Sequence, residues 1–380
     1  MRIRMAMIGG GKGSFIGPVH RMAATLDSEC ELVAAALSSS PANSLESGRA
    51  LGLPDNRNYE NWQTMLERES KLDAGVRPHF VSIVTPNHLH YAQVRESLLA
   101  GFSVVCDKPL CLTVSEAEEI GKIVSSSGRV FCLTHNYTGY PMIKLARDLV
   151  RQNMIGDVRK VAVEYFQGWL SADAASAGNR QAVWRSDPGR AGIAGTMADI
   201  GTHAFNLAEY VTCLKVTSVC ADLSATLYER RLDDDGNVLL RLEGGVKGSL
   251  LASQIATGEE NNLRLRVYGE RGGISWEQMN PNDLVVRWAG KPYQVYRTAT
   301  GFGDEGRKNM AYTRLPAGHP EGFIEGFANI YRAFFRSLRD NALNIPYTRD
   351  FPGIEEGIRG MMFLEAVVRS SEQNSVWTSL

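Results

Sequence analysis

The sequence predicts an α/β protein in two parts: a parallel sheet with crossover helices, then a largely antiparallel sheet with helices. Over the first third, short apolar runs alternate with stretches of helical spacing, which is the pattern of successive βαβ units. From about Val158 the apolar runs lengthen, and many alternate with period two, as half-buried strands do. A chain of 380 residues is long for one core and sufficient for two domains.

In the first part, each strand is predicted from an apolar run and each helix from the spacing between runs. The predicted strands cover residues 3–8, 31–37, 80–84, 103–106 and 130–134. The predicted helices cover residues 18–25, 41–51, 61–69, 89–100 and 115–126. The last strand follows a Gly128-Arg129 turn, so we place the domain boundary near residues 134–140. A first domain over residues 1–135 and a second over 136–380 are expected.

In the second part, strands are predicted at residues 158–169, 217–228, 246–256 and 263–268, and helices at 143–152 and 202–212. Residues 233–237 and 269–273 are predicted turns. A glycine-rich segment at 298–319 is predicted to be a long irregular loop. Aromatic and aliphatic residues then recur at helical spacing, a stripe that predicts core packing: Phe323, Phe327, Ile330, Tyr331, Phe334 and Leu338.

The composition is that of an ordinary soluble globular protein, 44% hydrophobic and 22% charged. A net charge of −1 predicts no attraction for nucleic acid or an anionic membrane. The first apolar run ends at Ile8, too short for a signal-peptide core, and no later run could span a bilayer. The six cysteines form no C-x-x-C pair, so reduced structural thiols and a cytoplasmic location are expected.

A glycine-rich segment at residues 9–17 follows the first predicted strand and precedes a predicted helix. Glycines in this context allow a tight turn and let backbone N–H groups approach a pyrophosphate. The third glycine comes later than G-x-G-x-x-G requires, so the loop is expanded. A flexible turn without a ligand is the alternative. The predicted dinucleotide contacts in this segment are Gly9, Gly11, Gly13, Ser14, Phe15 and Ile16.

The end of the second predicted strand carries no carboxylate to bind the ribose 2′-hydroxyl of NAD. The strand continues as Leu37-Ser38-Ser39-Ser40, and no arginine follows at once. Small hydroxyls such as that of Ser38 can serve NAD or the 2′-phosphate of NADP. The missing carboxylate favours NADP tolerance slightly, and the sequence leaves NAD or NADP open as the cofactor.

Three polar residues have the chemistry that alcohol oxidation requires. Lys108 follows the strand at 103–106, and Asp199 and His203 are four residues apart, on one face of a helix. Imidazole titrates near working pH and can accept a proton as a hydride departs. A lysine partly desolvated beside a positively charged nicotinamide would have a lowered pKa, and such groups stabilise a developing alkoxide. For His203 the alternative is a helix-capping or core histidine.

With these motifs the chain resembles the Gfo/Idh/MocA family of glucose–fructose oxidoreductase, inositol dehydrogenase and rhizopine-catabolism proteins. The glycine loop is followed by Ile-Gly-x-x-His at residues 16–20, and Thr-Pro-Asn-x-x-His stands at 85–90. Asp-Lys-Pro at 107–109 matches the family's Glu-Lys-Pro, and Trp-Arg follows at 184–185. Gly-x-x-x-Asp-x-Gly-x-His spans 195–203. The matches occur in the family's order and are spread over more than half of the chain.

The resemblance implies an N-terminal Rossmann dinucleotide-binding domain, a C-terminal α/β domain with an open, mainly antiparallel sheet, and a pocket between them. It implies an NAD(P)-dependent oxidoreductase acting on a hydroxyl of a sugar, sugar derivative or cyclitol. Lys108 would bind the reacting hydroxyl and help fix the nicotinamide, His203 would be the general acid/base, and Asp199 would orient the substrate or share the proton path. Relatives commonly pair through the open sheet face, which implies a homodimer or homotetramer.

Further residues complete the predicted site. The other expected cofactor contacts are Thr85, Pro86, Asn87, His90, Asp107, Lys108, Asn136, Trp184 and Arg185. The expected substrate contacts are Lys108, His135, Tyr137, Trp169, Asp199, His203 and His319, with Asn206 as a further polar candidate. Trp169 packs equally well as a buried tryptophan in a sheet, and His319 is more simply a residue at a helix N-terminus. No cluster has metal-ligand spacing, so no metal is expected.

The resemblance leaves two alternatives to a dehydrogenase. Some relatives are glycosidases that use tightly bound NAD for transient oxidation, followed by elimination and hydration. Others are non-catalytic co-regulators, but retention of Lys108, Asp199 and His203 argues against a sensor. Net reduction of the dinucleotide with a free polyol favours a dehydrogenase, whereas glycoside cleavage without it favours a glycosidase. Asp107 stands where the family has Glu, and we expect this shorter carboxylate to orient its loop.

Overall fold

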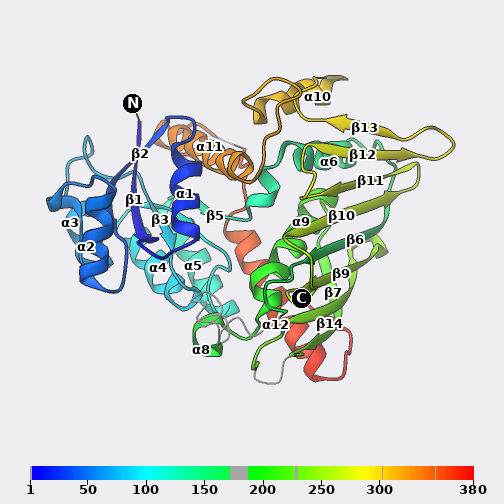
Figure 1. Cartoon of the computed structure of the whole chain (residues 1–380), viewed down its shortest axis with the longest axis horizontal. Helices are drawn as coiled ribbons and strands as arrows, with labels where there is room; N and C mark the ends of the chain where they lie inside the picture. The colour runs from blue at the N-terminus through cyan, green and yellow to red at the C-terminus, as the bar shows by residue number, and fades with distance from the viewer. Residues whose placement is uncertain (1, 172–186, 227–229, 302, 347) are drawn as a thin grey trace. The chain divides into compact units, whose positions relative to one another are not determined.

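The computed structural model describes residues 2–171, 187–226, 230–301, 303–346 and 348–380 (Figure 1). These residues form two compact units. Unit 1 comprises Met1–Asn136 with Phe327–Ile358, and unit 2 comprises Tyr137–Gly326 with Arg359–Leu380. The segment 327–358, which the expected boundary assigns to the second domain, packs within unit 1. The domain division at residue 135 stays a prediction.

Unit 1 is built on a parallel sheet of five strands in the order β2-β1-β3-β4-β5. The strands are β1 (Ile3–Gly9), β2 (Cys30–Ala36), β3 (Phe80–Val84), β4 (Ser103–Cys106) and β5 (Phe131–Leu133). Strands β1 and β3 are buried along their whole lengths, as expected for a parallel sheet covered on both faces. The strand order reverses between β1 and β3, and ligands of such sheets bind beyond the carboxyl ends at that switch point.

The helices of unit 1 that cross between these strands agree with their predicted positions to within about two residues. They are α1 (Ile16–Thr25), α2 (Pro41–Ala50), α3 (Trp62–Ser70), α4 (His90–Leu99) and α5 (Val114–Ser127). Local side chains explain the boundaries: the Thr113 hydroxyl and the Glu116 carboxylate form a capping box at the start of α5. Gly128, with a φ of 62°, ends that helix. The predicted α/β architecture of this part is confirmed.

The aromatic stripe predicted as core lies on α11 (Phe323–Ala342). Phe327, Tyr331 and Phe334 are almost completely buried, and the Phe334 ring centroid lies 5.1 Å from that of Phe80 on β3. The prediction of core packing is therefore confirmed. These residues complete the core around the N-terminal sheet. The periodicity of the helix predicts a buried face but not which sheet it packs on.

Unit 2 contains a sheet of nine strands in the order β13-β12-β11-β10-β6-β9-β8-β7-β14. Every neighbouring pair is antiparallel except β6 with β9. The strands are β6 (Val158–Phe166), β7 (Val216–Ser224), β8 (Asp235–Leu242), β9 (Lys247–Ser253), β10 (Asn262–Gly269), β11 (Gly272–Glu277), β12 (Asp283–Trp288), β13 (Gln294–Arg297) and β14 (Thr378–Ser379). The mainly antiparallel character predicted for this part is confirmed.

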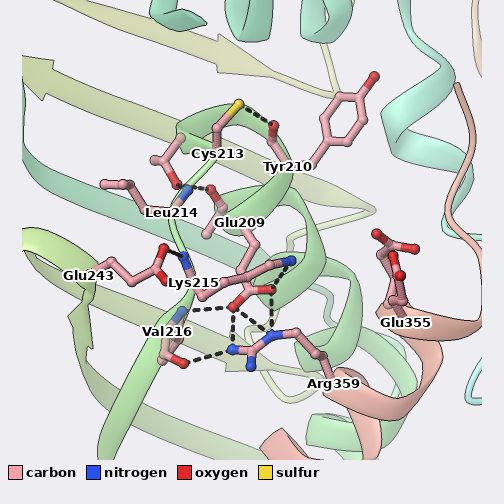
Figure 2. A network of polar contacts seen from close by, with 12 residues as sticks. Glu209, Tyr210, Cys213, Leu214, Lys215, Val216, Glu243, Glu355 and Arg359 are labelled. Atoms are coloured by element: carbon pink, nitrogen blue, oxygen red, sulfur yellow. Dashed lines mark hydrogen bonds and ion pairs between the residues drawn. The ribbon is translucent and has the colours of Figure 1, made fainter. Parts of the chain in front are cut away.

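The main helices of this part are α6 (Pro141–Arg151), α9 (Thr202–Thr212) and α12 (Ile354–Glu372), and shorter helices are α8 (Pro188–Ala191) and α10 (Gly303–Asn309). Figure 2 shows how the end of α9 is anchored: the Glu209 carboxylate accepts hydrogen bonds from the Arg359 guanidinium of α12 and, at 2.7 Å, from the Val216 amide of β7. Arg359 also donates to the Val216 carbonyl at 2.6 Å. This partly buried ion pair, with its additional backbone partners, fixes the helix that carries His203.

Several predicted elements of unit 2 differ from the structure. The predicted turn at 233–237 ends early, because Asp235 already pairs with Ser253 of β9 and Ser224 of β7, and ladder pairing overrides the turn propensity of aspartate. The predicted loop at 298–319 contains α10, whose sequence has almost no apolar periodicity. The pattern did not predict β8, β11, β12, β13, β14 or α12. The end of the strand predicted at 217–228 falls outside the described residues. Within the described ranges, no helix is long and apolar enough to cross a membrane.

Candidate functional site

The glycine loop between β1 and α1 is a close-packed turn. Gly9, Gly10 and Gly13 have φ values of 83°, 82° and 88°, a region that favours glycine. A Cβ on Gly17 would lie 2.2 Å from the Cα of Gly10, so the start of α1 rests directly on the loop. A Cβ on Gly11 would lie 2.8 Å from the Leu37 carbonyl oxygen. These glycines are required by backbone contacts, and the loop is an ordered turn.

The amide groups of the loop divide into two sets. Those of Gly11, Lys12, Ser14 and Gly17 donate to the Leu37 carbonyl, the Ser47 hydroxyl, the Gly11 carbonyl and the Ser14 hydroxyl. Among the described residues, the amides of Gly13, Phe15 and Ile16 have no protein acceptor. Amides at the start of a helix that lack acceptors are the groups that bind phosphate oxygens. The loop therefore fits a dinucleotide pyrophosphate.

The end of β2, where a dinucleotide ribose is expected, is polar and lacks a carboxylate. The Ser38 hydroxyl accepts from the Ser40 amide at 3.2 Å and the Asn43 side chain at 3.1 Å. Lys12, from the glycine loop, forms an exposed ion pair of 2.8 Å with Glu46 on α2. Ser38 thus has its lone pairs engaged, and its proton is the group it can offer to a ribose oxygen.

The Thr85-Pro86-Asn87 turn follows β3, and His90 ties it to the turn after β4. The fully buried His90 ring places Nε2 2.8 Å from the Thr85 carbonyl and Nδ1 2.8 Å from the Pro109 carbonyl. Burial lowers the pKa of His90, although the hydrogen bonds to these two carbonyls oppose the shift. The Thr85 hydroxyl donates to Gln93 at 2.6 Å. Both ring nitrogens of His90 face the backbone, which makes this residue a link between two loops.

Lys108 lies just beyond the carboxyl end of β4, and the bond to Pro109 is cis. The Asp107 carboxylate accepts from the Lys108 amide and from the Thr134 hydroxyl, both at 2.9 Å. The Asp107 amide in turn donates to the Ile83 carbonyl at 2.9 Å. These bonds orient the turn that carries Lys108, which is the role expected of Asp107.

His135 and Asn136 follow β5, on the same side of the sheet as Lys108. Burial, with the nearby Lys108 cation as a second cause, lowers the pKa of His135 to about 3, so its ring is neutral. Asn136 is 4% exposed, and its side-chain Nδ2 has no acceptor among the described residues. An unsatisfied buried donor normally has a partner in the functional state, which suits the expected role of Asn136 in binding a ligand.

Asp199 and His203 lie in the turn that enters α9 in unit 2. Residues Met197–Gly201 form one π-helical turn, closed by a bond from the Thr202 amide to the Met197 carbonyl. The expectation of a regular α-helical spacing is therefore wrong at Asp199, although His203 lies in the first turn of α9. Such π-turns often occur at functional sites.

The Asp233 side chain holds this turn in place. Its carboxylate accepts from the amides of Gly195 at 2.6 Å and Met197 at 2.8 Å, and its carbonyl accepts from the Thr196 amide at 2.9 Å. Burial of the carboxyl group raises the pKa of Asp233 to about 6, although these amides oppose the shift. A Cβ on Gly195 would lie 2.4 Å from the Asp233 carbonyl oxygen, which explains the glycine that begins the motif.

Side chains from other parts of unit 2 lie around Asp199 and His203. The Gln254 amide, 1% exposed, donates to the Asp199 carboxylate at 2.9 Å. The Tyr137 ring meets the His203 ring edge-on, with centroids 5.0 Å apart, and the Tyr165 ring lies 6.4 Å from His203. Asn206, one turn further along α9, is buried, and its Oδ1 has no donor among the described residues. Unit 2 thus joins the predicted residues Tyr137, Asp199 and His203.

The remaining predicted site residues have different placements. The Trp169 indole donates to the Gln167 side chain at 2.9 Å, and the same Gln167 oxygen accepts from Gln254, the residue that binds Asp199. His319 lies in an exposed loop, four residues before α11 begins, and its ring lies 3.1 Å from the Pro316 carbonyl. It does not begin a helix. Trp184 and Arg185 lie outside the described residues.

Sequence reasoning missed most of the residues that hold the candidate groups. Gln254, Gln167 and Asn261 are isolated amides far apart in the chain, and nothing in their neighbourhoods distinguishes them. The close packing of Gly17 on Gly10 could have been predicted, because a glycine that follows a glycine loop at the start of a helix indicates a close backbone contact. The role of Asp233 was hidden, because an aspartate-rich segment looks like an ordinary turn.

Comparisons with known proteins show which family and which solved structures the chain is similar to. Residues 3–135 match the family described as an oxidoreductase family with an NAD-binding Rossmann fold, and residues 143–275 match the GFO/IDH/MocA C-terminal domain. The uncharacterized oxidoreductase YfiI of Bacillus subtilis is 33% identical, over 99% of this chain and 96% of its own. Levoglucosan dehydrogenase of Pseudarthrobacter phenanthrenivorans is 26% identical over 76% of each chain. The structure of an inositol dehydrogenase homolog from Azotobacter vinelandii, complexed with NAD+, matches with a TM-score of 0.96 and 32% identity, covering 100% of this chain and 98% of that one.

Proposed function

The chain belongs to the Gfo/Idh/MocA family of NAD-binding oxidoreductases, and on that premise we propose that it oxidises a hydroxyl of a sugar, sugar derivative or cyclitol. The hydride would pass between the hydroxyl carbon and a nicotinamide, and Lys108 and His203 would handle the proton. The inositol and levoglucosan dehydrogenases among the relatives support this substrate class.

The observation that carries the proposal is the turn that enters α9. It presents a carboxylate and an imidazole from one short segment, and the Asp233 carboxylate fixes its backbone at the Gly195 and Met197 amides. Groups that handle a proton during hydride transfer must be held in place before the reaction, because their reorganisation would add to the barrier.

Unit 1 would hold the cofactor, which supplies the hydride acceptor when bound. The amides of Gly13, Phe15 and Ile16 would bind the pyrophosphate, and Ser38 would face the ribose. The Thr85-Pro86-Asn87 turn, at the carboxyl end of β3 beside the switch point, would line the same crevice. The unsatisfied amide of Asn136 would contact the cofactor or the substrate.

In this proposal Lys108 and His203 act on the same reacting hydroxyl. The Lys108 ammonium donates to the hydroxyl oxygen and stabilises the negative charge that develops there as the proton leaves. His203 accepts the proton through its imidazole. Asp199, held as a hydrogen-bond acceptor, orients the substrate or the imidazole. The directions reverse when a ketone is reduced.

The test is a screen of free polyols, sugars and glycosides with NAD and NADP, followed by the absorbance of the reduced nicotinamide. We expect net reduction with a free polyol or sugar. Lys108→Ala and His203→Ala should each lower kcat by about 10²–10⁴-fold, the usual contribution of acid–base catalysis, with dinucleotide affinity largely unchanged. Lys71→Ala, which removes an exposed lysine of unit 1, is the matched control.

A double variant tests whether both residues act on one hydroxyl. If they do, Lys108→Ala and His203→Ala combined should cost less than the product of the single losses. Near-normal turnover of either single variant would contradict the mechanism. Cleavage of a glycoside without net reduction would instead assign the chain to the NAD-dependent glycosidases.

We further propose a cytoplasmic homodimer or homotetramer, as for many relatives. Light scattering of the purified protein measures the mass of the assembly, and a mass near that of one chain would contradict this part of the proposal.

A further inference from the structure

We propose that Gln254 is a positioning residue for the reaction, which holds Asp199 as a hydrogen-bond acceptor through a directed network of amides and hydroxyls in unit 2. The inference rests on the proposed function, since Gln254 would act through Asp199. No motif includes this glutamine, which directly follows β9.

The orientation of the Gln254 amide follows from its neighbours. A carboxylate only accepts hydrogen bonds, so the atom 2.9 Å from Asp199 must be the Nε2 donor. The second hydrogen of that NH₂ group points to Gln167 Oε1, 3.0 Å away. Gln254 Oε1 then accepts from the Thr196 hydroxyl at 2.9 Å, and Thr196 belongs to the turn that carries Asp199. Gln254 therefore holds Asp199 directly, and it also holds the Thr196 side chain three residues earlier in the same segment.

The same logic fixes the next amide. The Trp169 indole, which only donates, also points to Gln167 Oε1 at 2.9 Å, so two donors meet at this oxygen. Gln167 must then present its NH₂ group to Asn261 Oδ1, 2.7 Å away. The orientation set at Asp199 is thus enforced independently by a tryptophan two residues from Gln167.

The network ends in a closed ring beside His203. The Tyr165 hydroxyl donates to Asn261 Oδ1 at 2.7 Å, and the Asn261 NH₂ group donates to the Tyr137 oxygen at 3.1 Å. Because the Tyr165 proton is engaged, Tyr137 donates to the Tyr165 oxygen at 2.5 Å and closes the ring. The Tyr137 ring in turn packs edge-on against His203. One network therefore connects the carboxylate and the imidazole of the proposed proton path.

Several ionisable groups surround Asp199 and enter any titration. Asp233 lies behind the turn, on its backbone side, and His203 stands on the first turn of α9. Tyr137 lies in the 3₁₀ turn η3 (Asn136–Gly139) and Tyr165 lies on β6. Burial raises the pKa of both hydroxyls, with the Asp199 charge as a smaller cause. Arg230 and Asp234 form an ion pair of 2.9 Å on the other side of Gln254. The Asp234 backbone carbonyl accepts a hydrogen bond from the backbone N–H of Gln254. Gln254 carries no charge, so replacing it alters a hydrogen bond to Asp199 without removing a charged group from its surroundings.

The experiment replaces that donor with an acid. Gln254→Glu places a second carboxyl group against Asp199, and two carboxylates at this distance share a proton, which raises one of the two pKa values. We expect the acid limb of the kcat/KM profile to move up by about one pH unit or more. At neutral pH, kcat should fall more than KM changes, and dinucleotide affinity should stay within about twofold, since the cofactor loop is in unit 1.

A direct measurement removes the dependence on activity. The carboxyl carbon of Asp199 can be titrated by NMR in protein labelled at aspartate, with Asp199→Asn to assign the resonance. Its midpoint should rise in Gln254→Glu. Gln254→Met, which keeps the length and removes the donor without adding a charge, should lower kcat without the upward shift of the acid limb.

The chain offers a matched control. Asn262 is buried on β10, and its Nδ2 donates to the Glu259 carboxylate at 2.8 Å, the same kind of contact at nearly the same distance. Asn262→Asp therefore opposes two carboxylates in unit 2 without touching Asp199. We expect it to leave the pH profile and the Asp199 titration unchanged.

The outcomes separate this inference from the proposed function. An Asp199 midpoint that does not move in Gln254→Glu overturns the inference, whether or not the protein oxidises a polyol. Equal shifts of the pH profile in Gln254→Glu and Asn262→Asp also overturn it, because the effect would then be a general loss of stability. A raised Asp199 midpoint in a protein that oxidises no polyol would support the hydrogen bond and refute the proposed function.

Discussion

The two units prepare their parts of the proposed site in different ways. In unit 1 the backbone itself forms the candidate phosphate site. Three glycines adopt positive φ, and Gly17 packs directly on Gly10, so that backbone amides point outward. In unit 2 side chains hold the site, because Asp233, just before β8, and Gln254, just after β9, bind the segment that contains Asp199. A phosphate needs only N–H groups, whereas a proton path needs particular atoms at particular distances.

The difference has a consequence for substitution. A backbone turn fails when a side chain is added, and a side-chain network fails when a donor or an acceptor is exchanged. The first kind of damage should appear in dinucleotide binding, and the second in kcat and its dependence on pH. Four predictions test this division, and they are ordered from the largest expected effect to the smallest.

Gly17→Ala should damage the backbone-built part most. Its Cβ would lie 2.2 Å from the Gly10 Cα and 2.7 Å from the Gly10 carbonyl oxygen, so the loop must move. We expect a cost at or above the upper end of overpacking, about 3 kcal/mol, and about 100-fold weaker dinucleotide binding, measured by titration. Gly75→Ala is the control, since nothing lies within 4 Å of its Cβ. Wild-type affinity in Gly17→Ala would show that the loop does not depend on this contact.

Asp233 should make stability depend on pH. Its pKa is raised from 3.8 to about 6 in the folded protein, so its contribution to stability is fully present below about pH 4 and is lost as the pH rises through about 6. The loss corresponds to about 3 kcal/mol. Denaturant unfolding of the wild type and Asp233→Asn across this range measures it. The wild type should lose stability relative to the variant with rising pH, and a constant difference would contradict the raised pKa.

Asp233→Asn should also lower activity at neutral pH. An amide in place of the carboxylate keeps one acceptor and turns a donor toward either the Gly195 or the Met197 amide. Leaving one buried N–H unsatisfied costs about 1–3 kcal/mol, and we expect kcat to fall about tenfold as the Asp199 turn shifts. Dinucleotide affinity should stay unchanged. Asp222→Asn, on the exposed side of β7, is the control, and weaker dinucleotide binding in Asp233→Asn would break the division between the units.

Ser38→Asp should have the smallest effect, on the choice of cofactor alone. A carboxylate at the end of β2 accepts from the ribose 2′-hydroxyl of NAD and repels the 2′-phosphate of NADP. We expect the ratio of kcat/KM for NAD to that for NADP to rise about tenfold, which is about 1.4 kcal/mol. An unchanged ratio would mean that Ser38 does not face the ribose.

The sequence predicts unit 1, where local backbone features form the site, better than unit 2, where distant side chains do. Strands β1, β3 and β4 and the helices that follow them were predicted to within a few residues, because each is a local run bounded by glycine, proline or a cap. In unit 2, α9 was predicted at its observed bounds, yet the π-turn before it was not. Asp233 holds that turn through a hydrogen bond to Met197, 36 positions away in the chain. Strand β8 begins inside an aspartate-rich segment because Asp235 already pairs with Ser224 of β7 and Ser253 of β9.

By itself, the sequence determined the α/β class, the glycine loop, the place of Lys108 after a buried strand and the occurrence of Asp199 and His203 in one short segment. These depend on neighbours within about one turn or one strand, where periodicity and backbone preference act. Only the tertiary structure decided which residues hold them. Gln254 meets Asp199 across 55 positions and Asn261 meets Tyr137 across 124, and a hydrogen bond between distant positions leaves no pattern in the sequence around either residue.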